Sequence, residues 1–305
     1  MNDVSPNTHT HTYPAHTYVH KYVYNYSFEK YYDPMPVLHW MQRHPFIPIW
    51  TCLIYLIGIT TGQYYMKHQV RKQRFHFRST LAIWNFVLST FSFIGMIRTV
   101  PQLLHNLMTL SLRDNVCLDP RATYGSGSTG LWIQLFVLSK FPELIDTVFI
   151  VLHQKPLIFL HWYHHITVLL YCWHSYVTKS PPGIFFVVMN YSVHAAMYLY
   201  YGAMTLRMVP KWFPPMIITT LQISQMMVGM IVTGIAFYYS QTSPTCGITT
   251  ENNMAAFLMY GSYLILFVQF FVGRYHTTTK KMTTTSSSQH QTITSTEKSL
   301  SNKQL

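Results

Sequence analysis

Charged side chains are scarce in this chain, and acidic ones are scarcer than basic ones. Asp, Glu, Lys and Arg make up 10% of its 305 residues, whereas soluble domains carry about 25%. Hydrophobic residues account for 49%. This balance excludes an ordinary soluble domain and indicates an integral membrane protein. The net charge of +12 does not indicate nucleic-acid binding, because the basic residues lie in short loops between apolar segments.

A continuous apolar run is missing from residues 1–45, which are instead rich in His, Tyr and Thr. A cleavable signal peptide needs an apolar core, so we expect none here. The first membrane helix is expected to act as an uncleaved signal-anchor. Residues 276–305 are rich in Ser and Thr and are expected to be disordered. This tail lacks a KDEL or clean dilysine ending, so no retrieval signal is identified.

Seven apolar segments are long enough to cross a bilayer, which takes roughly 20 helical residues. They lie at about 46–66, 81–104, 129–152, 157–175, 183–206, 213–239 and 254–274. The sequence therefore predicts an all-α membrane domain over residues 46–275, between the His/Tyr/Thr-rich segment and the tail.

The distribution of basic residues predicts the orientation of this domain. Of the 21 Lys and Arg residues, thirteen fall on one side of the predicted membrane, six fall on the other, and two lie inside spans. Because cytosolic loops are enriched in Lys and Arg, we expect a lumenal N-terminus and a cytosolic C-terminus. Asn25 then begins a lumenal glycosylation sequon. Cys117 and Cys246 fall in lumenal loops where a disulfide is permitted; the alternative is two free thiols.

The histidines at 161, 164 and 165 share one face of a predicted membrane helix. Polar side chains at membrane depth are costly and usually face a functional cavity. Histidine can act there as a base, a nucleophile or a metal ligand. Other predicted spans also carry polar side chains: Lys140, Glu143 and Asp146; Asn190 and His194; and Gln222 and Gln225.

The depth of these groups predicts that they form one site. At a rise of 1.5 Å per residue, all of them fall between the cytosolic face and the middle of the bilayer. Mutual pairing would reduce the cost of burying Lys140, Glu143 and Asp146, and a purely structural ion-pair cluster is the alternative for them. Gln222 and Gln225 could instead hydrogen-bond neighbouring helices.

Four motifs resemble those of the ELO family of very-long-chain fatty acid elongases. The pattern K-x-x-E-L-x-D-T falls on residues 140–147, and H-x-x-H-H falls on 161–165. The pattern M-N-x-x-V-H begins at Met189, and T-x-x-Q-x-x-Q begins at Thr219. The resemblance covers about residues 28–275. The run HWYHHITVLLY is most similar to the branch that extends saturated and monounsaturated chains of palmitate length and shorter.

The resemblance implies a reaction and a fold. An acyl-CoA condenses with malonyl-CoA to give 3-ketoacyl-CoA, CoA and carbon dioxide, with no bound cofactor or metal. Six of seven helices would surround an acyl-chain tunnel in the endoplasmic reticulum membrane. The reductase and dehydratase of the elongation cycle are the expected partners, and a homodimer is a further expectation.

The same resemblance suggests roles for the polar residues. His164 would be the nucleophile, with His161 and His165 orienting it and exchanging protons. His194 and Asn190 would place the malonyl thioester, and the remaining intramembrane polar residues would shape the wall. Basic residues on the cytosolic face are candidates for the CoA phosphates, or carry topology-determining charge alone: Lys155, Arg207, Lys211 and Arg274.

Two other classes remain as alternatives. A di-iron membrane desaturase or hydroxylase also carries H-x-x-H-H, but it needs about eight histidines in several boxes, whereas this chain has one such box. A seven-helix receptor or transporter would fit the topology, but it does not require three histidines inside the membrane.

Overall fold

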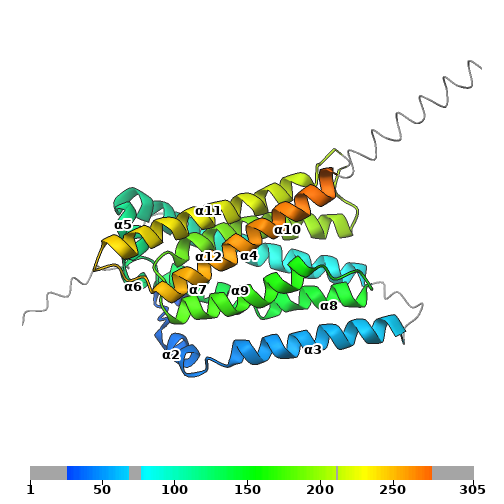
Figure 1. Ribbon diagram of the computed structural model, residues 1–305, viewed down its shortest axis with the longest axis horizontal. Helices are drawn as coiled ribbons and strands as arrows, with labels where there is room; N and C mark the ends of the chain where they lie inside the picture. Colours follow the sequence, from blue (N-terminus) through cyan, green and yellow to red (C-terminus); the bar gives the residue numbers. More distant parts are fainter. Residues whose placement is uncertain (1–25, 69–76, 211, 277–305) are drawn as a thin grey trace, which may run out of the picture.

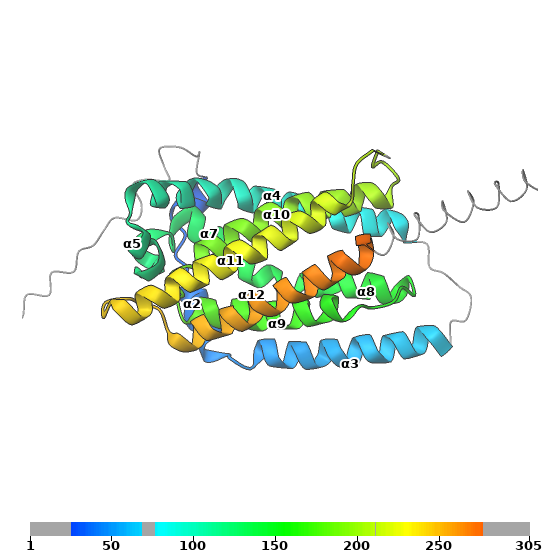
Figure 2. The same ribbon diagram turned by 45° about the horizontal axis from the view of Figure 1, so that its top comes forward.

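The computed structural model describes residues 26–68, 77–210 and 212–276, and within these ranges all regular structure is helical. The long helices run side by side along the longest axis of the molecule, as Figures 1 and 2 show. Short helices lie at one end of this bundle (Figure 1). The helices are α1 (Ser27–Lys30), α2 (Met35–Arg43), α3 (Ile47–His68), α4 (Arg78–Thr109), α5 (Leu112–Cys117), α6 (Pro120–Thr123), α7 (Gly127–Ser139), α8 (Ile145–Leu152), α9 (Phe159–Val177), α10 (Gly183–Thr205), α11 (Met216–Thr242) and α12 (Thr250–Phe271).

Four helices in the described part are long and apolar enough to cross a membrane, namely α4, α10, α11 and α12 with its extension to Arg274. The pair α2 and α3, bent by 66°, gives a fifth candidate. The chain is therefore a multi-pass membrane protein. The count of seven spans stays a prediction, because α7 and α8 are short and α9 carries the polar histidine box.

The segment 129–152, expected as one continuous helix, is broken. Helix α7 ends at Ser139, a 3-10 turn covers Pro142–Leu144, and α8 begins at Ile145. Proline has no amide hydrogen to donate and its ring crowds the preceding turn, so Pro142 interrupts the helix. The break places the Lys140 and Glu143 side chains in the interior of the bundle, where both are buried.

Helices α4, α7 and α10 pack closely around the buried ring of Tyr191. A Cβ atom at Gly95 of α4 would overlap this ring, so only glycine allows α10 to approach so closely. The Tyr191 hydroxyl donates to the carbonyl of Trp132 on α7, at 2.8 Å. The three helices are thereby held in one arrangement beside Asn190, the preceding residue.

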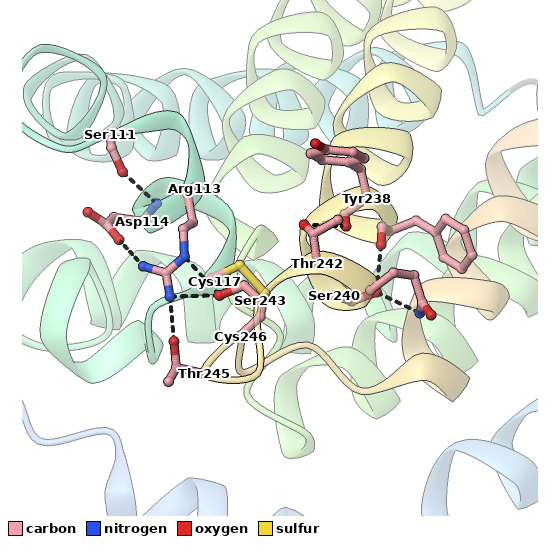
Figure 3. Close-up of a disulfide and its surroundings, with 12 residues drawn as sticks. Ser111, Arg113, Asp114, Cys117, Tyr238, Ser240, Thr242, Ser243, Thr245 and Cys246 are labelled. Carbon is pink, nitrogen blue, oxygen red and sulfur yellow. Dashed lines mark hydrogen bonds and ion pairs between the residues drawn. A yellow bond between two sulfur atoms is a disulfide. The ribbon is translucent and has the colours of Figure 1, made fainter.

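A disulfide between Cys117 and Cys246 links α5 to the loop between α11 and α12, as Figure 3 shows. This is the pairing that the sequence analysis favours. Arg113 reinforces the link by donating from Nη2 to the hydroxyls of Ser243, at 2.8 Å, and Thr245. The end of the molecule that carries the short helices is therefore tied together covalently.

The segment before α3 docks onto the bundle through a buried carboxylate. Glu29, which is 1% exposed, lies 3.2 Å from Arg98 Nε of α4. It also accepts from Trp132 Nε1 of α7, at 3.0 Å. The sequon residue Asn25 lies outside the described residues.

The ends of the long helices are sorted as the charge pattern requires. Helices α3, α8, α10 and α12 all end at the side opposite α5 and α6 (Figures 1 and 2). Lys155, Arg207 and Arg274 follow α8, α10 and α12 in the chain, so these basic residues gather at one end. That this end is cytosolic stays a prediction.

Candidate functional site

The three histidines of α9 form one cluster, as their spacing predicts. The rings of His161 and His165 are 4.5 Å apart, and those of His164 and His165 are 5.6 Å apart. His165 is buried, and the other two are partly buried. The ring of His164 also packs 4.9 Å from Tyr263 of α12. The cluster is therefore enclosed between α9 and its neighbours.

Hydrogen bonds constrain the cluster from two sides. His161 Nε2 is 2.9 Å from the hydroxyl of Thr147 on α8. The Tyr263 hydroxyl donates to the backbone carbonyl of His164, at 3.2 Å, and bonds Thr167, at 2.6 Å. Helices α8 and α12 thus both bond to the histidine-bearing part of α9.

A second polar network joins the break after α7 to α10. Lys140 Nζ donates to Glu143 Oε1, at 2.7 Å, and to Asn190 Oδ1, at 3.3 Å. Asn190 Nδ2 in turn lies 3.1 Å from His194 Nε2. Ser139 donates to the same Glu143 oxygen, at 2.9 Å. The amide of Asn190 therefore links the buried ion pair to His194.

The two groups of histidines lie near one another. The charges of Lys140 and Glu143 and the imidazole of His194 act on the ring of His164, so the box on α9 and the network on α10 are close in space. That all of these groups form one site, as the depth argument predicts, stays a prediction.

Asp146 does not pair with Lys140, so the expected mutual pairing of all three charged residues is wrong. Its carboxylate instead accepts from Trp84 Nε1 of α4, at 2.6 Å, and from the Tyr198 hydroxyl of α10, at 2.7 Å. Lys140 and Glu143, three residues apart across the break, do pair, whereas Asp146 lies in α8 and its carboxylate finds donors on two other helices. Asp146 therefore bridges three helices beside the site.

The glutamines of α11 have different surroundings. Gln222 Nε2 donates to the sulfur of Met197 on α10, at 3.1 Å, and Gln225 is buried. The contact to Met197 favours the helix-packing alternative for Gln222. The basic candidates Lys155, Arg207 and Arg274 are exposed, as a phosphate-binding mouth requires, and Lys211 lies outside the described residues.

A cavity of about 90 Å³ lies at the end of the bundle that carries the short helices. Its lining side chains on α7, α9 and α10 are Phe136, Val137, Tyr171, Cys172, Phe186 and Val187. These residues lie three, four or seven positions from Lys140, His164, His165 and Asn190, so they share helix faces with the candidate site residues. The space is apolar.

Tyr124, between α6 and α7, lines the far end of this cavity. Its hydroxyl donates to the carbonyls of Ser180, at 2.8 Å, and Pro181, at 3.0 Å. Burial raises the pKa of the Tyr124 phenol, so the group stays protonated as a donor. The hydroxyl bonds therefore hold the ring in a defined position in the cavity wall.

Sequence reasoning missed several side chains around the site. Thr147 ends the motif at residues 140–147, so the motif points to this residue. The motif does not predict the contact of Thr147 with His161. Tyr55, Trp84 and Tyr263 come from helices without such motifs, and their contacts depend on tertiary packing. Among the described residues, no group of three or more His, Cys, Asp or Glu side chains is arranged to hold a metal ion.

Comparison with known proteins gives consistent matches. A model of the ELO (GNS1/SUR4) family matches residues 40–283. The chain is 42% identical over 256 residues to very long chain fatty acid elongase 6 of Drosophila melanogaster, covering 83% of this chain and 80% of the relative. It is 39% identical over 252 residues to the human protein of the same name, covering 82% and 92%. It is 37% identical over 251 residues to a putative fatty acid elongase 3 of Caenorhabditis elegans, covering 81% and 76%.

Proposed function

Because this chain belongs to the ELO (GNS1/SUR4) family of fatty acid elongases, we propose that it catalyses the condensing step of elongation. In this reaction an acyl-CoA and malonyl-CoA give 3-ketoacyl-CoA, CoA and carbon dioxide. The observation that carries the proposal is the buried network from Lys140 through Asn190 to His194, which lies near His164 of the histidine box.

The first half of the reaction forms an acyl-enzyme. An imidazole nitrogen of His164 attacks the thioester carbonyl, the carbon–sulfur bond breaks, and the CoA thiolate leaves with a proton from the imidazole. His161 and His165 exchange this proton. The ring centroid of His165 lies 4.5 Å from that of His161 and 5.6 Å from that of His164. The apolar cavity beyond the site takes the acyl chain, and the low polarity of its wall suits a hydrocarbon.

The second half forms the new carbon–carbon bond. Malonyl-CoA loses carbon dioxide, and the electron pair of the broken bond becomes an enolate at the thioester. Its carbon attacks the acyl-imidazole, the carbon–nitrogen bond breaks, and the leaving imidazolate takes up a proton through His161 and His165, which restores neutral His164. His194 and Asn190 place the malonyl thioester, and fixed donors stabilise oxyanions best in a dry site. The Lys140 ammonium, held by Glu143 at 2.7 Å, supplies positive charge in this wall.

The placement of the protein follows from the same proposal. Seven helices cross the endoplasmic reticulum membrane, with Lys155, Arg207, Lys211 and Arg274 on the cytosolic side, where they bind the CoA phosphates. The reductase and dehydratase of the elongation cycle consume the 3-keto product. The preferred substrates are saturated and monounsaturated chains of palmitate length or shorter. This preference is supported by the run HWYHHITVLLY and by relatives named elongase 6.

The test is a condensation assay on the purified full-length protein with labelled malonyl-CoA and a panel of acyl-CoAs. We expect 3-ketoacyl-CoA two carbons longer than the acyl substrate. The His164→Ala variant should lose product formation and should not form a covalent adduct with labelled acyl-CoA. His174→Ala is the matched control, because His174 is exposed on the same helix. Full activity of folded His164→Ala would refute the assignment of the nucleophile.

A further inference from the structure

Helix α3 presents one narrow face to the rest of the bundle. Its buried residues include Cys52, Tyr55, Ile59 and Met66, which are three, four or seven residues apart and so share a face. A Cβ atom at Gly62 would lie 3.2 Å from the Val151 side chain, so α3 and α8 approach closely. Tyr55 brings a hydroxyl group into this otherwise apolar contact.

The Tyr55 hydroxyl begins a hydrogen-bonded chain that ends at the site. It lies 2.7 Å from Thr147 Oγ1 on α8, and the same Thr147 oxygen lies 2.9 Å from His161 Nε2 on α9. Tyr55 is 8% exposed and Thr147 is fully buried. Bulk water therefore does not replace these bonds when one of them is lost.

We propose that Tyr55 and Thr147 are positioning residues for His161, and that α3 takes part in catalysis through them. The inference rests on the proposed condensing function. The relay holds His161 Nε2 toward α8 and leaves Nδ1 as the nitrogen that exchanges protons in the site. Which nitrogen of a histidine carries the proton is set by the hydrogen bond that the other nitrogen makes.

The effect on rate follows from the geometry. Without the relay the His161 ring can rotate, and only part of the population presents Nδ1 to the site. Its ring lies 4.5 Å from His165, so rotation also disturbs the neighbouring imidazole. Loss of roughly one net hydrogen bond in the transition state lowers kcat about tenfold. The KM for acyl-CoA should stay nearly constant, because the relay lies away from the apolar cavity.

The experiment measures kcat and KM on the purified full-length protein, with thermal unfolding as a check on folding. Thr147→Val removes the hydroxyl at nearly constant volume and should lower kcat about tenfold. Thr147→Ser keeps the hydroxyl and should restore most of the rate. Tyr55→Phe should lower kcat severalfold in wild-type protein and should have little further effect in the Thr147→Val background.

Matched controls come from the exposed face of the same helix. Thr60 bonds only to carbonyls of α3, at 2.8 and 3.0 Å, and Tyr64 is 67% exposed. Thr60→Val and Tyr64→Phe should therefore behave as wild type. Kcat values for folded Thr147→Val and Tyr55→Phe within twofold of wild type would overturn the inference. The inference would also be overturned if the two substitutions lowered kcat additively in the double variant, or if Thr147→Ser failed to restore the rate.

The Tyr55→Phe variant keeps the inference falsifiable if Thr147→Val does not fold, because it removes only a hydroxyl and preserves side-chain volume closely. A wild-type protein without condensation activity would refute the proposed function instead, so the two failures are distinguishable.

Discussion

At the residue scale, the site depends on a charge that is costly to bury. The side chains of Lys140 and Glu143 are 1% and 5% exposed, so both ions have left water almost completely. Part of the desolvation cost is offset by Coulomb attraction and by the hydrogen bonds to Ser139 and Asn190. The Phe136 ring centroid, 4.1 Å from Lys140 Nζ, adds a cation–π contact. The ion pair is therefore part of the architecture of the bundle.

Glu143→Gln should destabilise the protein by about 3–5 kcal/mol, because it leaves the Lys140 ammonium buried without a counter-ion. The free energy of unfolding in mixed micelles measures this loss. Glu251→Gln removes an exposed carboxylate from the first turn of α12 and should change stability little. A Glu143→Gln variant as stable as Glu251→Gln would show that Lys140 is neutral or hydrated.

At the element scale, a break in one helix and two short helices outside the long ones shape the site. The break after α7 leaves Lys140 and Glu143 paired in the interior, and Asp146 bonds to α4 and α10. The short helices α2 and α6 and the adjoining Tyr124 line one end of the cavity. The cavity therefore ends among short segments outside the long helices.

Tyr124→Ala should shift the product distribution toward longer acyl chains, because removal of the ring enlarges the cavity at the end that Tyr124 lines. Tyr124→Phe keeps the ring and loses only the hydroxyl bonds, so it should retain the wild-type product lengths. Gas chromatography of the products from a panel of acyl-CoAs measures the shift. Val116→Ala, at a buried position of the same end outside the cavity, is the packing control. Equal product profiles for all three variants would contradict this limit on chain length.

At the scale of the whole molecule, the disulfide joins positions 129 residues apart. It ties α5 to the loop between α11 and α12, the last two long helices. A crosslink that closes a long loop restricts the unfolded chain and stabilises the fold relative to it. The end of the bundle where Tyr124 lines the cavity is thus also the end that carries the disulfide.

Cys117→Ser should destabilise the folded protein by about 2–5 kcal/mol, and reduction of the wild type should have a similar effect. Denaturant unfolding in detergent, together with mobility on non-reducing gels, measures both. Cys52→Ala is the control, because Cys52 is a free thiol within α3. An unchanged unfolding midpoint after reduction would show that the link adds nothing to stability.

Much of this protein could be predicted from local features of its sequence. Apolar length predicts membrane helices, because hydrocarbon accepts only backbone groups that are bonded internally. The positions of the box at 161–165 and of Asn190 and His194 predict a shared polar site, because unpaired polar groups are costly at membrane depth. The ELO motifs predict the family, which the comparisons confirm.

The remaining features depend on contacts between residues distant in the sequence, which only the tertiary structure decides. Lys140, Glu143 and Asp146 are spaced three residues apart, yet Asp146 bonds Trp84 and Tyr198, which belong to helices distant in the sequence. No spacing in the sequence relates Tyr55 to Thr147, 92 residues away, since their contact requires α3 to pack against α8. Composition and periodicity determine which segments become helices and which faces are polar. The packing of those helices determines which polar groups meet.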